Sequence, residues 1–305
     1  MKKVIAICGP TATGKSELAV ELALRFNGEV INFDSQQFYQ GLDIGTAKPT
    51  EKEKKGVPHH LYSILFPDEE MNAGKFLELV DPLVEDVWGR GRVPILVGGT
   101  GLYLRVFEYG LFEVNVPKEI RDKVRSMVKE NLALAYEELK RLDPEYAKKV
   151  SSRDFVRVSR ALEVCLATGK PFSEFHKSHS FAQAKPRYPI LKIGLILERE
   201  ELYNKINRRV LEMIERGWVE EVKRLLEMGY PPSSKAFKAI GYRHIISYIK
   251  GEITLDTAIK LIQRDTRRYA KRQITWFKKE KNIHWFRPED REKIFTLVES
   301  FLKDC

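Results

Sequence analysis

The stretch Gly9-Pro10-Thr11-Ala12-Thr13-Gly14-Lys15-Ser16 decides the fold of this chain, because it matches the phosphate-binding pattern G-x-x-x-x-G-K-[ST] at every fixed position. The run Val4–Cys8 before it is short and apolar, which predicts a buried strand. After it, apolar residues recur at the spacing of one helix face: Leu18, Ala19, Leu22, Ala23 and Phe26. A strand, a glycine-rich loop and a helix in this order predict a phosphate-binding loop at the start of a parallel α/β sheet.

This loop has the geometry to bind an anion. Its backbone N–H groups and the positive end of the following helix converge on one point, where Lys15 adds a full charge. The hydroxyl of Ser16 is placed to ligate Mg²⁺. We therefore expect residues 9–16 to bind a diphosphate or a triphosphate, with Mg²⁺ as the cofactor. The alternative is an ordinary glycine turn before a helix.

Composition and charge limit the class of protein. The chain has 305 residues, of which 43% are hydrophobic, so it is long enough to bury a core in one or two domains. Its 53 Lys and Arg against 43 Asp and Glu give a net charge of +10, which suggests a polyanionic partner. Three widely spaced cysteines without a metal-ligand pattern suggest a reducing compartment. No stretch is long enough to span a bilayer, so we expect a cytoplasmic protein with no membrane partner.

Two further strand ends carry candidate catalytic residues. Glu29–Phe33 predicts a second strand, and Asp34 follows it at the sheet edge where ligands bind in parallel α/β folds. Asp34 is therefore a candidate general base, although it would also suit a helix N-cap. Val93–Val97 predicts a third strand, which ends in Gly98-Gly99-Thr100-Gly101. An ATPase usually has a Mg²⁺-binding aspartate at such a strand end, so its absence weakens that interpretation.

The remaining pattern predicts a P-loop NTPase-like parallel sheet core flanked by helices, with a mostly helical insertion domain. We expect residues 1–110 to form the first part of the core, 111–189 the insertion and 190–305 the rest. Residues 40–72 lack periodicity and predict an irregular active-site region, in which His59 and His60 have no third ligand and favour a structural role. Helical segments are predicted over these residues: 73–90, 117–131, 132–142, 154–168, 198–216, 218–228 and 255–280.

Two basic segments suit contact with RNA. Arg153, Arg157 and Arg160 form a stripe at helical spacing, which is typical of a solvated face or a nucleic-acid contact. The final predicted helix carries eight Lys or Arg and two acidic residues between positions 264 and 281. Its aromatic residues, Tyr269, Trp276 and Phe277, suit base stacking as well as packing in the core. We expect Lys271 and Arg272 to contact phosphates there.

Several strings together point to one family. They are Gly9–Ser16, Asp34-Ser35 with Tyr39, Asp43–Pro49, Val97–Tyr103, Ser159–Val164, Ile240–Arg243 and Ala270–Phe277. In this order, and over nearly the whole chain, they resemble bacterial tRNA dimethylallyltransferases. The resemblance implies transfer of a dimethylallyl group from dimethylallyl diphosphate to the N6 amine of the adenosine 3′ of the anticodon (position 37) in tRNA.

The resemblance also assigns roles to residues. It implies that the loop residues Gly9–Ser16 hold the diphosphate, and that Asp34, Thr100 and Lys15 act at the reaction centre. It implies tRNA contacts for these residues, to which the basic final helix adds Lys271 and Arg272: Asp34, Ser35, Gln36, Gln37, Thr100, Arg121, Val156, Arg157, Val158, Ser159, Arg160, Lys238, Gly241 and Arg243. The expected partners are the anticodon stem-loop of tRNA and dimethylallyl diphosphate, and we expect a monomer.

Three other functions are open at this point. A small-molecule kinase would use the same loop to bind ATP, and an RNA-binding nucleotide switch would bind tRNA without turnover. A prenyltransferase acting on a free adenine nucleotide would have little use for the basic final helix.

Overall fold

A computed structural model describes residues 2–111, 114–178 and 184–303. Its sheet contains six parallel strands in the order β3-β2-β4-β1-β5-β6. The strands have these bounds: β1 Val4–Cys8, β2 Gly28–Asn32, β3 His59–His60, β4 Val93–Val97, β5 Ile190–Leu195 and β6 Ile283–Phe286. The predicted α/β fold with a parallel sheet is confirmed.

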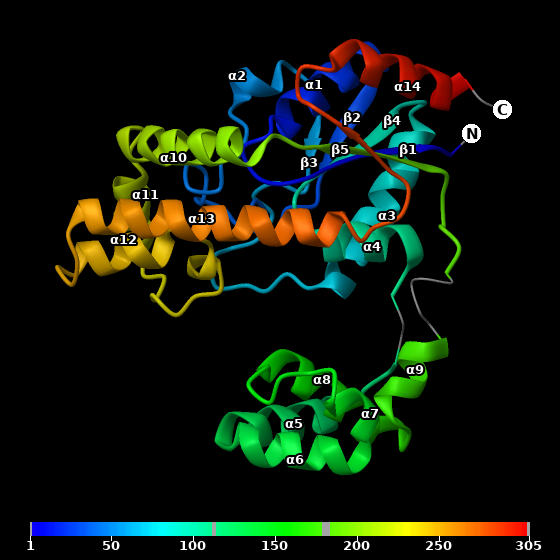
Figure 1. Ribbon diagram of the computed structural model, residues 1–305, viewed down its shortest axis with the longest axis vertical. Helices are drawn as coiled ribbons and strands as arrows, with labels where there is room; N and C mark the ends of the chain where they lie inside the picture. The colour runs from blue at the N-terminus through cyan, green and yellow to red at the C-terminus, as the bar shows by residue number, and fades with distance from the viewer. Residues whose placement is uncertain (1, 112–113, 179–183, 304–305) are drawn as a thin grey trace. The chain divides into compact units, whose positions relative to one another are not determined.

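Helices connect the strands (Figure 1). Those of the first half are α1 Lys15–Arg25, α2 Glu51–Lys54, α3 Ala73–Gly89, α4 Gly101–Tyr109, α5 Lys118–Glu130, α6 Leu132–Leu142, α7 Pro144–Ala147, α8 Phe155–Thr168 and α9 Phe172–Ser178. Those that follow are α10 Arg199–Glu215, α11 Trp218–Glu227, the 3₁₀ turn η1 Ala236–Lys238, α12 Tyr242–Ile249, α13 Leu255–Phe277 and α14 Arg291–Lys303.

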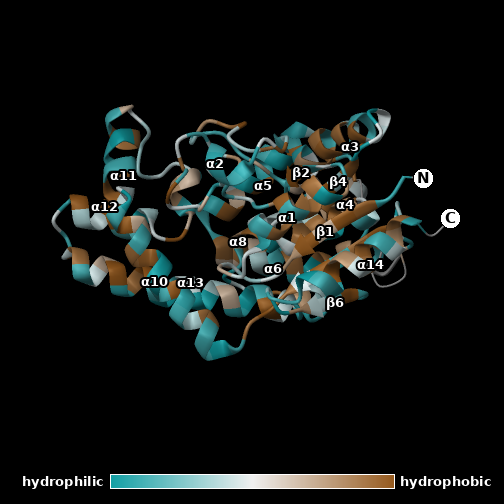
Figure 2. Ribbon diagram, turned by 90° about the horizontal axis from the view of Figure 1, so that it is seen from above, coloured by the Kyte–Doolittle hydropathy of each residue, from teal (hydrophilic) through white to brown (hydrophobic). Residues whose placement is uncertain are grey.

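The central strands are buried on both faces. Every residue of β1 and β2 is buried, as expected for a parallel sheet with helices on both sides. Ile5 and Ile7 of β1 pack with Leu18 and Leu22 of α1 and with Ile294 of α14. Figure 2 shows β1 and β4 in the brown of hydrophobic residues. This core fixes the strand ends from which the functional loops leave.

The chain divides into two compact units. Residues 1–110 and 186–305 form the α/β unit, and residues 111–185 form the helical unit. The helical unit has its own core, in which Val124 and Val128 of α5 pack with Leu139 of α6 and Val158 of α8. It ends at Lys185, earlier than the boundary at residue 189 expected from the sequence. Pro186–Pro189 therefore belongs with the α/β unit, where the Pro189 carbonyl accepts a hydrogen bond from Val4 N.

The structure corrects the prediction for two segments. The region 40–72 contains the strand β3 and the helix α2, which are too short to produce a periodic pattern. The last predicted helix ends at Phe277, and β6 and α14 follow it. The two histidines belong to β3: His59 Nδ1 donates to Val57 O at 2.8 Å, and His60 Nε2 lies 2.6 Å from the buried carboxylate of Glu29. Both contacts support the structural role.

Candidate active site

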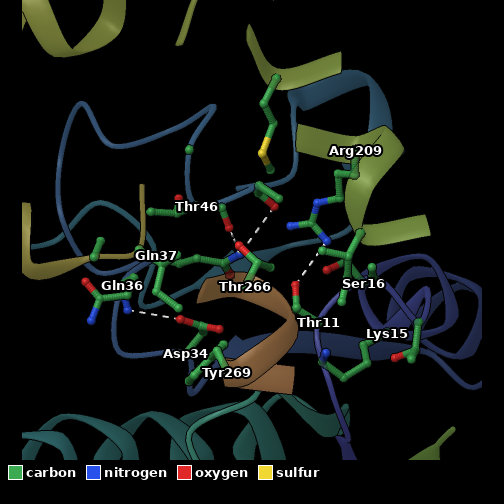
Figure 3. A pocket seen from close by; sticks show the side chains of 18 of the residues that line it. Thr11, Lys15, Ser16, Asp34, Gln36, Gln37, Thr46, Arg209, Thr266 and Tyr269 are labelled. Carbon is green, nitrogen blue, oxygen red and sulfur yellow. Dashed lines mark hydrogen bonds between the residues drawn. The ribbon is translucent and has the colours of Figure 1, made fainter. Parts of the chain in front are cut away.

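Three loops meet where the carboxyl ends of neighbouring strands lie side by side. Because β4 pairs with both β1 and β2, the phosphate loop after β1, Thr100 after β4 and Asp34 after β2 come to one edge of the sheet. A cavity of about 580 Å³ opens there, lined by Thr11–Glu17 and by Asp34–Gln37. Figure 3 shows 18 of the side chains that line it, among them Lys15, Asp34 and Tyr269. All of its lining residues belong to the α/β unit.

The two fixed glycines of the loop are required by its shape. A β-carbon on Gly9 would lie 2.4 Å from Leu195 O, and Gly9 has a φ of 127°. Gly14, at the N-cap of α1, has a φ of 81°. Thr13 Oγ1 and Lys15 Nζ both donate to Pro10 O, at 2.9 and 2.7 Å, which closes the loop on itself. The sequence therefore folds here as the pattern predicts.

The Lys15 ammonium lies in an unfavourable environment for a cation. Burial lowers its pKa to about 8, and the positive charge of Arg209 adds to that effect, while the Asp34 carboxylate opposes it. A bound anion would hold the ammonium in its charged form. The environment of Lys15 therefore suits a residue whose positive charge is compensated by a bound phosphate group.

Asp34 is held by its neighbours in a tight turn. Its backbone N–H donates to Asn32 Oδ1 at 2.8 Å, and its Oδ1 accepts from Gln36 N at 3.0 Å. No helix begins at this point, so the alternative role as a helix N-cap is wrong and the carboxylate caps a turn instead. Burial raises the pKa of Asp34, while Gln36 N–H, Lys15 and Arg209 oppose the rise. The result is a carboxylate of increased basicity beside two cations.

Thr100 lies next to Asp34 rather than on the wall of the cavity. Its Oγ1 accepts a hydrogen bond from Ser35 N at 2.9 Å, which joins the end of β4 to the Asp34 turn. The glycines around it leave no room for side chains. A β-carbon on Gly98 would lie 2.7 Å from Phe33 C, and one on Gly99 would lie 2.1 Å from Gln273 Nε2. This packing explains why no aspartate follows β4.

Some lining residues are not among the site residues expected from the sequence. Arg209 on α10 donates from Nη1 to Thr11 Oγ1 at 3.2 Å, and burial lowers the pKa of its guanidinium. Tyr269, Thr266 and Gln273 line the cavity from α13, which packs against α10. Arg209 belongs to a predicted helix that contains no motif. Its position at the cavity therefore follows only from the tertiary packing of α10. Tyr269, which the sequence allowed as a core anchor, faces the cavity, whereas Phe277 is buried in the core.

A buried carboxylate holds the wall opposite the phosphate loop. Both oxygens of Glu221 on α11 are used: Oε2 accepts from Asp43 N and Ile44 N at 2.9 and 2.6 Å, and Oε1 accepts from Tyr242 Oη at 2.6 Å. The indole of Trp218 fills the space between Gly45 and Gly241, where a β-carbon would approach it to 2.0 and 2.1 Å. Lys238 lines the cavity beside this wall.

The expected tRNA contacts differ in how they are placed. Gln36, Gln37, Lys238 and Arg272 line the cavity, and Ser35 does so as well. Lys271 and Arg243 are exposed outside it, while Gly241 is buried against Trp218.

In the helical unit, Val156 is 74% exposed, and Arg121, Arg157 and Arg160 reach the surface or its edge. Val158 and Ser159 are buried inside that unit. Their side chains therefore face the interior of that unit rather than its surface.

Within the described residues, no three His, Cys, Asp or Glu side chains are grouped closely enough to form a metal site of their own. No described helix has both the length and the apolar character needed to cross a bilayer.

Comparison with known proteins adds to this geometry. A model of the IPP transferase family matches residues 37–280, and a model named isopentenyl transferase matches residues 2–66. The chain is 44% identical over 312 residues to a tRNA dimethylallyltransferase of Caldanaerobacter subterraneus, with 99% of each chain covered.

Two solved structures are also similar. One is a tRNA isopentenylpyrophosphate transferase from Bacillus halodurans, with a TM-score of 0.74, 38% identity, and coverage of 99% of this chain and 97% of that one. The other is a eukaryotic dimethylallyltransferase acting on tRNA, with a TM-score of 0.85, 31% identity, and coverage of 98% and 77%.

Proposed function

The chain belongs to the IPP transferase family of tRNA dimethylallyltransferases, and on that premise we propose how its residues carry the reaction. It transfers a dimethylallyl group from dimethylallyl diphosphate to the N6 amine of the adenosine 3′ of the anticodon, which gives N6-isopentenyladenosine and diphosphate. One observation carries this proposal: the phosphate loop, Asp34 and Arg272 of the basic helix α13 line one cavity.

The phosphate loop binds the leaving group. As the C–O bond of the prenyl diphosphate breaks, negative charge grows on the diphosphate oxygens. The loop amides, Lys15 and Arg209 stabilise that charge. Because both cations are largely shielded from water, their electrostatic attraction for the diphosphate is stronger than it would be in solvent.

Asp34 accepts the proton of the amine. An adenine amine is a poor nucleophile, so removal of its proton as the new bond forms assists the attack. Only Oδ1 of Asp34 is used by the turn, and among the described residues none donates a hydrogen bond to Oδ2. Thr100 holds the Ser35 amide and so fixes the turn that aims the carboxylate.

The donor set fits a divalent cation that is held mainly by the substrate. Ser16 and Asp34 line the same cavity and supply a hydroxyl and a carboxylate oxygen, the ligand types that Mg²⁺ takes along with phosphate oxygens and water. We propose that Ser16 holds Mg²⁺ there, where the ion would neutralise charge on the departing diphosphate.

We further propose that tRNA contacts Gln36, Gln37, Lys238 and Arg272 in the cavity, and Arg243 and Lys271 outside it. Residues of α10, α11 and α13 line the cavity, and the adenine has to leave its stack to enter it. In the helical unit we propose RNA contacts for the exposed residues Arg121, Val156 and Arg157 and for the half-buried Arg160.

Transfer of label tests the function. The chain is incubated with unmodified tRNA, Mg²⁺ and dimethylallyl diphosphate labelled in the prenyl group, and a parallel reaction contains ATP labelled in the terminal phosphate. The expected result is prenyl label in the RNA and no phosphoryl transfer. Label that stays in small molecules, or phosphate transferred from ATP, would refute the proposal.

A further inference from the structure

The side chain of Gln273 joins the phosphate loop to the end of β4. Its Oε1 accepts a hydrogen bond from Thr11 N at 2.9 Å, and its Nε2 donates to Gly99 O at 3.1 Å. The residue is only 4% exposed, although it lines the cavity. The reversed amide would set donor against donor and acceptor against acceptor, so this orientation is the one that both partners require.

This contact occupies a donor that the loop would otherwise offer to phosphate. Backbone N–H groups are what a loop of this kind uses to cradle a phosphate chain. The amides of Lys15 and Ser16 lie in the first turn of α1 and have no carbonyl partner within the helix, so they point to the anion. The amide of Thr11, near the other end of the loop, points to Gln273 instead.

The far end of the loop is also fixed, and its amide donor is already taken by an acceptor. Arg209 holds the Thr11 hydroxyl, and Gln273 holds the Thr11 amide, so Thr11 is restrained through both its side chain and its backbone. The Gln273 carbonyl oxygen is the negative end of an amide dipole. A phosphate chain that extended from the start of α1 toward Thr11 would meet this oxygen in place of an N–H donor.

We propose that Gln273 sets the length of the phosphate chain that the loop accepts, favouring a diphosphate over a triphosphate. This inference rests on the proposed function, since a prenyl diphosphate has two phosphates and ATP has three. Gln273 of α13 is thus a specificity-determining residue. Its effect is on the ratio of the affinity for a diphosphate to the affinity for a triphosphate.

The test uses inorganic pyrophosphate and inorganic triphosphate, titrated calorimetrically into the full chain at one free Mg²⁺ concentration without tRNA. The wild type should bind pyrophosphate more tightly. Gln273→Ala frees the Thr11 amide for a charge-assisted hydrogen bond, so the preference for pyrophosphate should fall by about tenfold or more. Gln273→Glu loses the hydrogen bond to Gly99 O but keeps an acceptor for the Thr11 amide and adds a negative charge, so the preference should be retained or increased.

Gln263→Ala is the matched control. Gln263 lies on the same helix and donates to a backbone carbonyl, Asn207 O at 3.1 Å, but does not line the cavity. Its replacement should leave the preference unchanged.

If Gln273→Ala loses affinity for pyrophosphate and triphosphate equally, Gln273 is a structural anchor and the proposal is overturned. An unchanged ratio of the two affinities in this variant, or a wild type that shows no preference for pyrophosphate, would overturn it as well. If Gln273→Ala does not fold, Gln273→Glu decides: a preference below that of the wild type overturns the proposal. The proposed function fails by a different result, the absence of transfer to tRNA.

Discussion

Asp34 combines two properties that a proton acceptor at this site needs. The turn through Asn32 and Gln36 fixes its direction, and burial raises its pKa, which increases its basicity. Lys15 and Arg209 limit that rise in the pKa through their positive charges. Its chemistry therefore depends on residues from three separate parts of the chain.

Asp34→Asn should lower kcat by roughly 10²–10⁴-fold while the chain stays folded. The amide is nearly isosteric and can still accept the hydrogen bond from Gln36 N, but it is too weakly basic to take a proton. Affinity for both substrates should change only a few-fold, because the proton moves as the new bond forms. Single-turnover rates with saturating tRNA measure this. A near-normal rate would remove the general-base role, and a matching loss of diphosphate affinity would indicate that Asp34 acts through Mg²⁺.

Lys15 should make diphosphate binding pH-dependent. Its pKa is lowered to about 8, so it is charged below that pH and loses its proton as the pH rises through it. Pyrophosphate affinity should therefore fall above pH 8, approaching about tenfold per pH unit. Lys15→Arg keeps its charge over this range and serves as the control for the titration of pyrophosphate itself. Parallel pH profiles of the two proteins in calorimetric titrations would argue against a neutral Lys15 in the free enzyme.

At the scale of elements, α11 acts as a support between two loops. Glu221 binds the backbone of the Asp43–Gly45 loop, and Trp218 lies between Gly45 and Gly241. The strings Asp43–Pro49 and Ile240–Arg243, which are far apart in the sequence, thereby lie at one wall of the cavity. The indole leaves no room for a side chain at either glycine, and Gly241 also has a φ of 99°.

Gly45→Ala should destabilise the chain by about 1–3 kcal/mol, because the new methyl group would lie 2.0 Å from Trp218 Nε1 and force the loop away. Since Thr46 and Ala47 line the cavity, tRNA affinity should fall with stability. Gly89→Ala is the control: this glycine has nothing within 4 Å of the added methyl and lies at the end of α3. Urea unfolding compares the variants. Equal stability of the two would show that the Trp218 contact does not constrain the loop.

The helix α13 separates two kinds of basic residue. Lys271 is exposed outside the cavity, whereas Arg272 lines it beside Tyr269. Because Arg272 lines the cavity, its replacement can alter diphosphate binding as well as tRNA binding, so Lys271 is the residue that tests the tRNA contact alone.

Lys271→Ala should reduce the slope of log affinity for tRNA against log salt by about one, since one phosphate contact is lost. Its affinity for pyrophosphate should stay unchanged. Lys293→Ala, on α14, removes another exposed positive charge, at a residue that does not line the cavity, and should leave the slope unaltered. Salt titrations with identical slopes for Lys271→Ala and the wild type would make this part of α13 structural.

At the scale of the whole molecule, the local patterns predict the elements and the ligand edge of the sheet. Val4–Cys8 and Val93–Val97 form strands at the predicted residues, because runs of buried apolar residues between turn signals have few other solutions. Parallel pairing then places the residues that follow β1, β2 and β4 together. The phosphate loop and Asp34 could therefore be assigned to one site from the sequence.

The walls of the site could not be predicted in this way. Arg209 and Gln273 contact Thr11 across sequence separations of 198 and 262 residues. No motif contains Arg209, and the string Ala270–Phe277 does not by itself show that Gln273 reaches the phosphate loop. The buried positions of Val158 and Ser159 likewise depend on how α8 packs against α5 and α6. Tertiary packing, rather than propensity, decides which face of each helix meets the substrate.

The most direct test of the account is the identity of the modified nucleoside. Two tRNA transcripts, which differ only in adenosine or guanosine 3′ of the anticodon, are incubated with the chain, Mg²⁺ and dimethylallyl diphosphate, and their nucleosides are analysed by mass spectrometry. The account predicts N6-isopentenyladenosine from the adenosine transcript and no prenylated nucleoside from the other. Prenylation of both transcripts, or of neither, would contradict it.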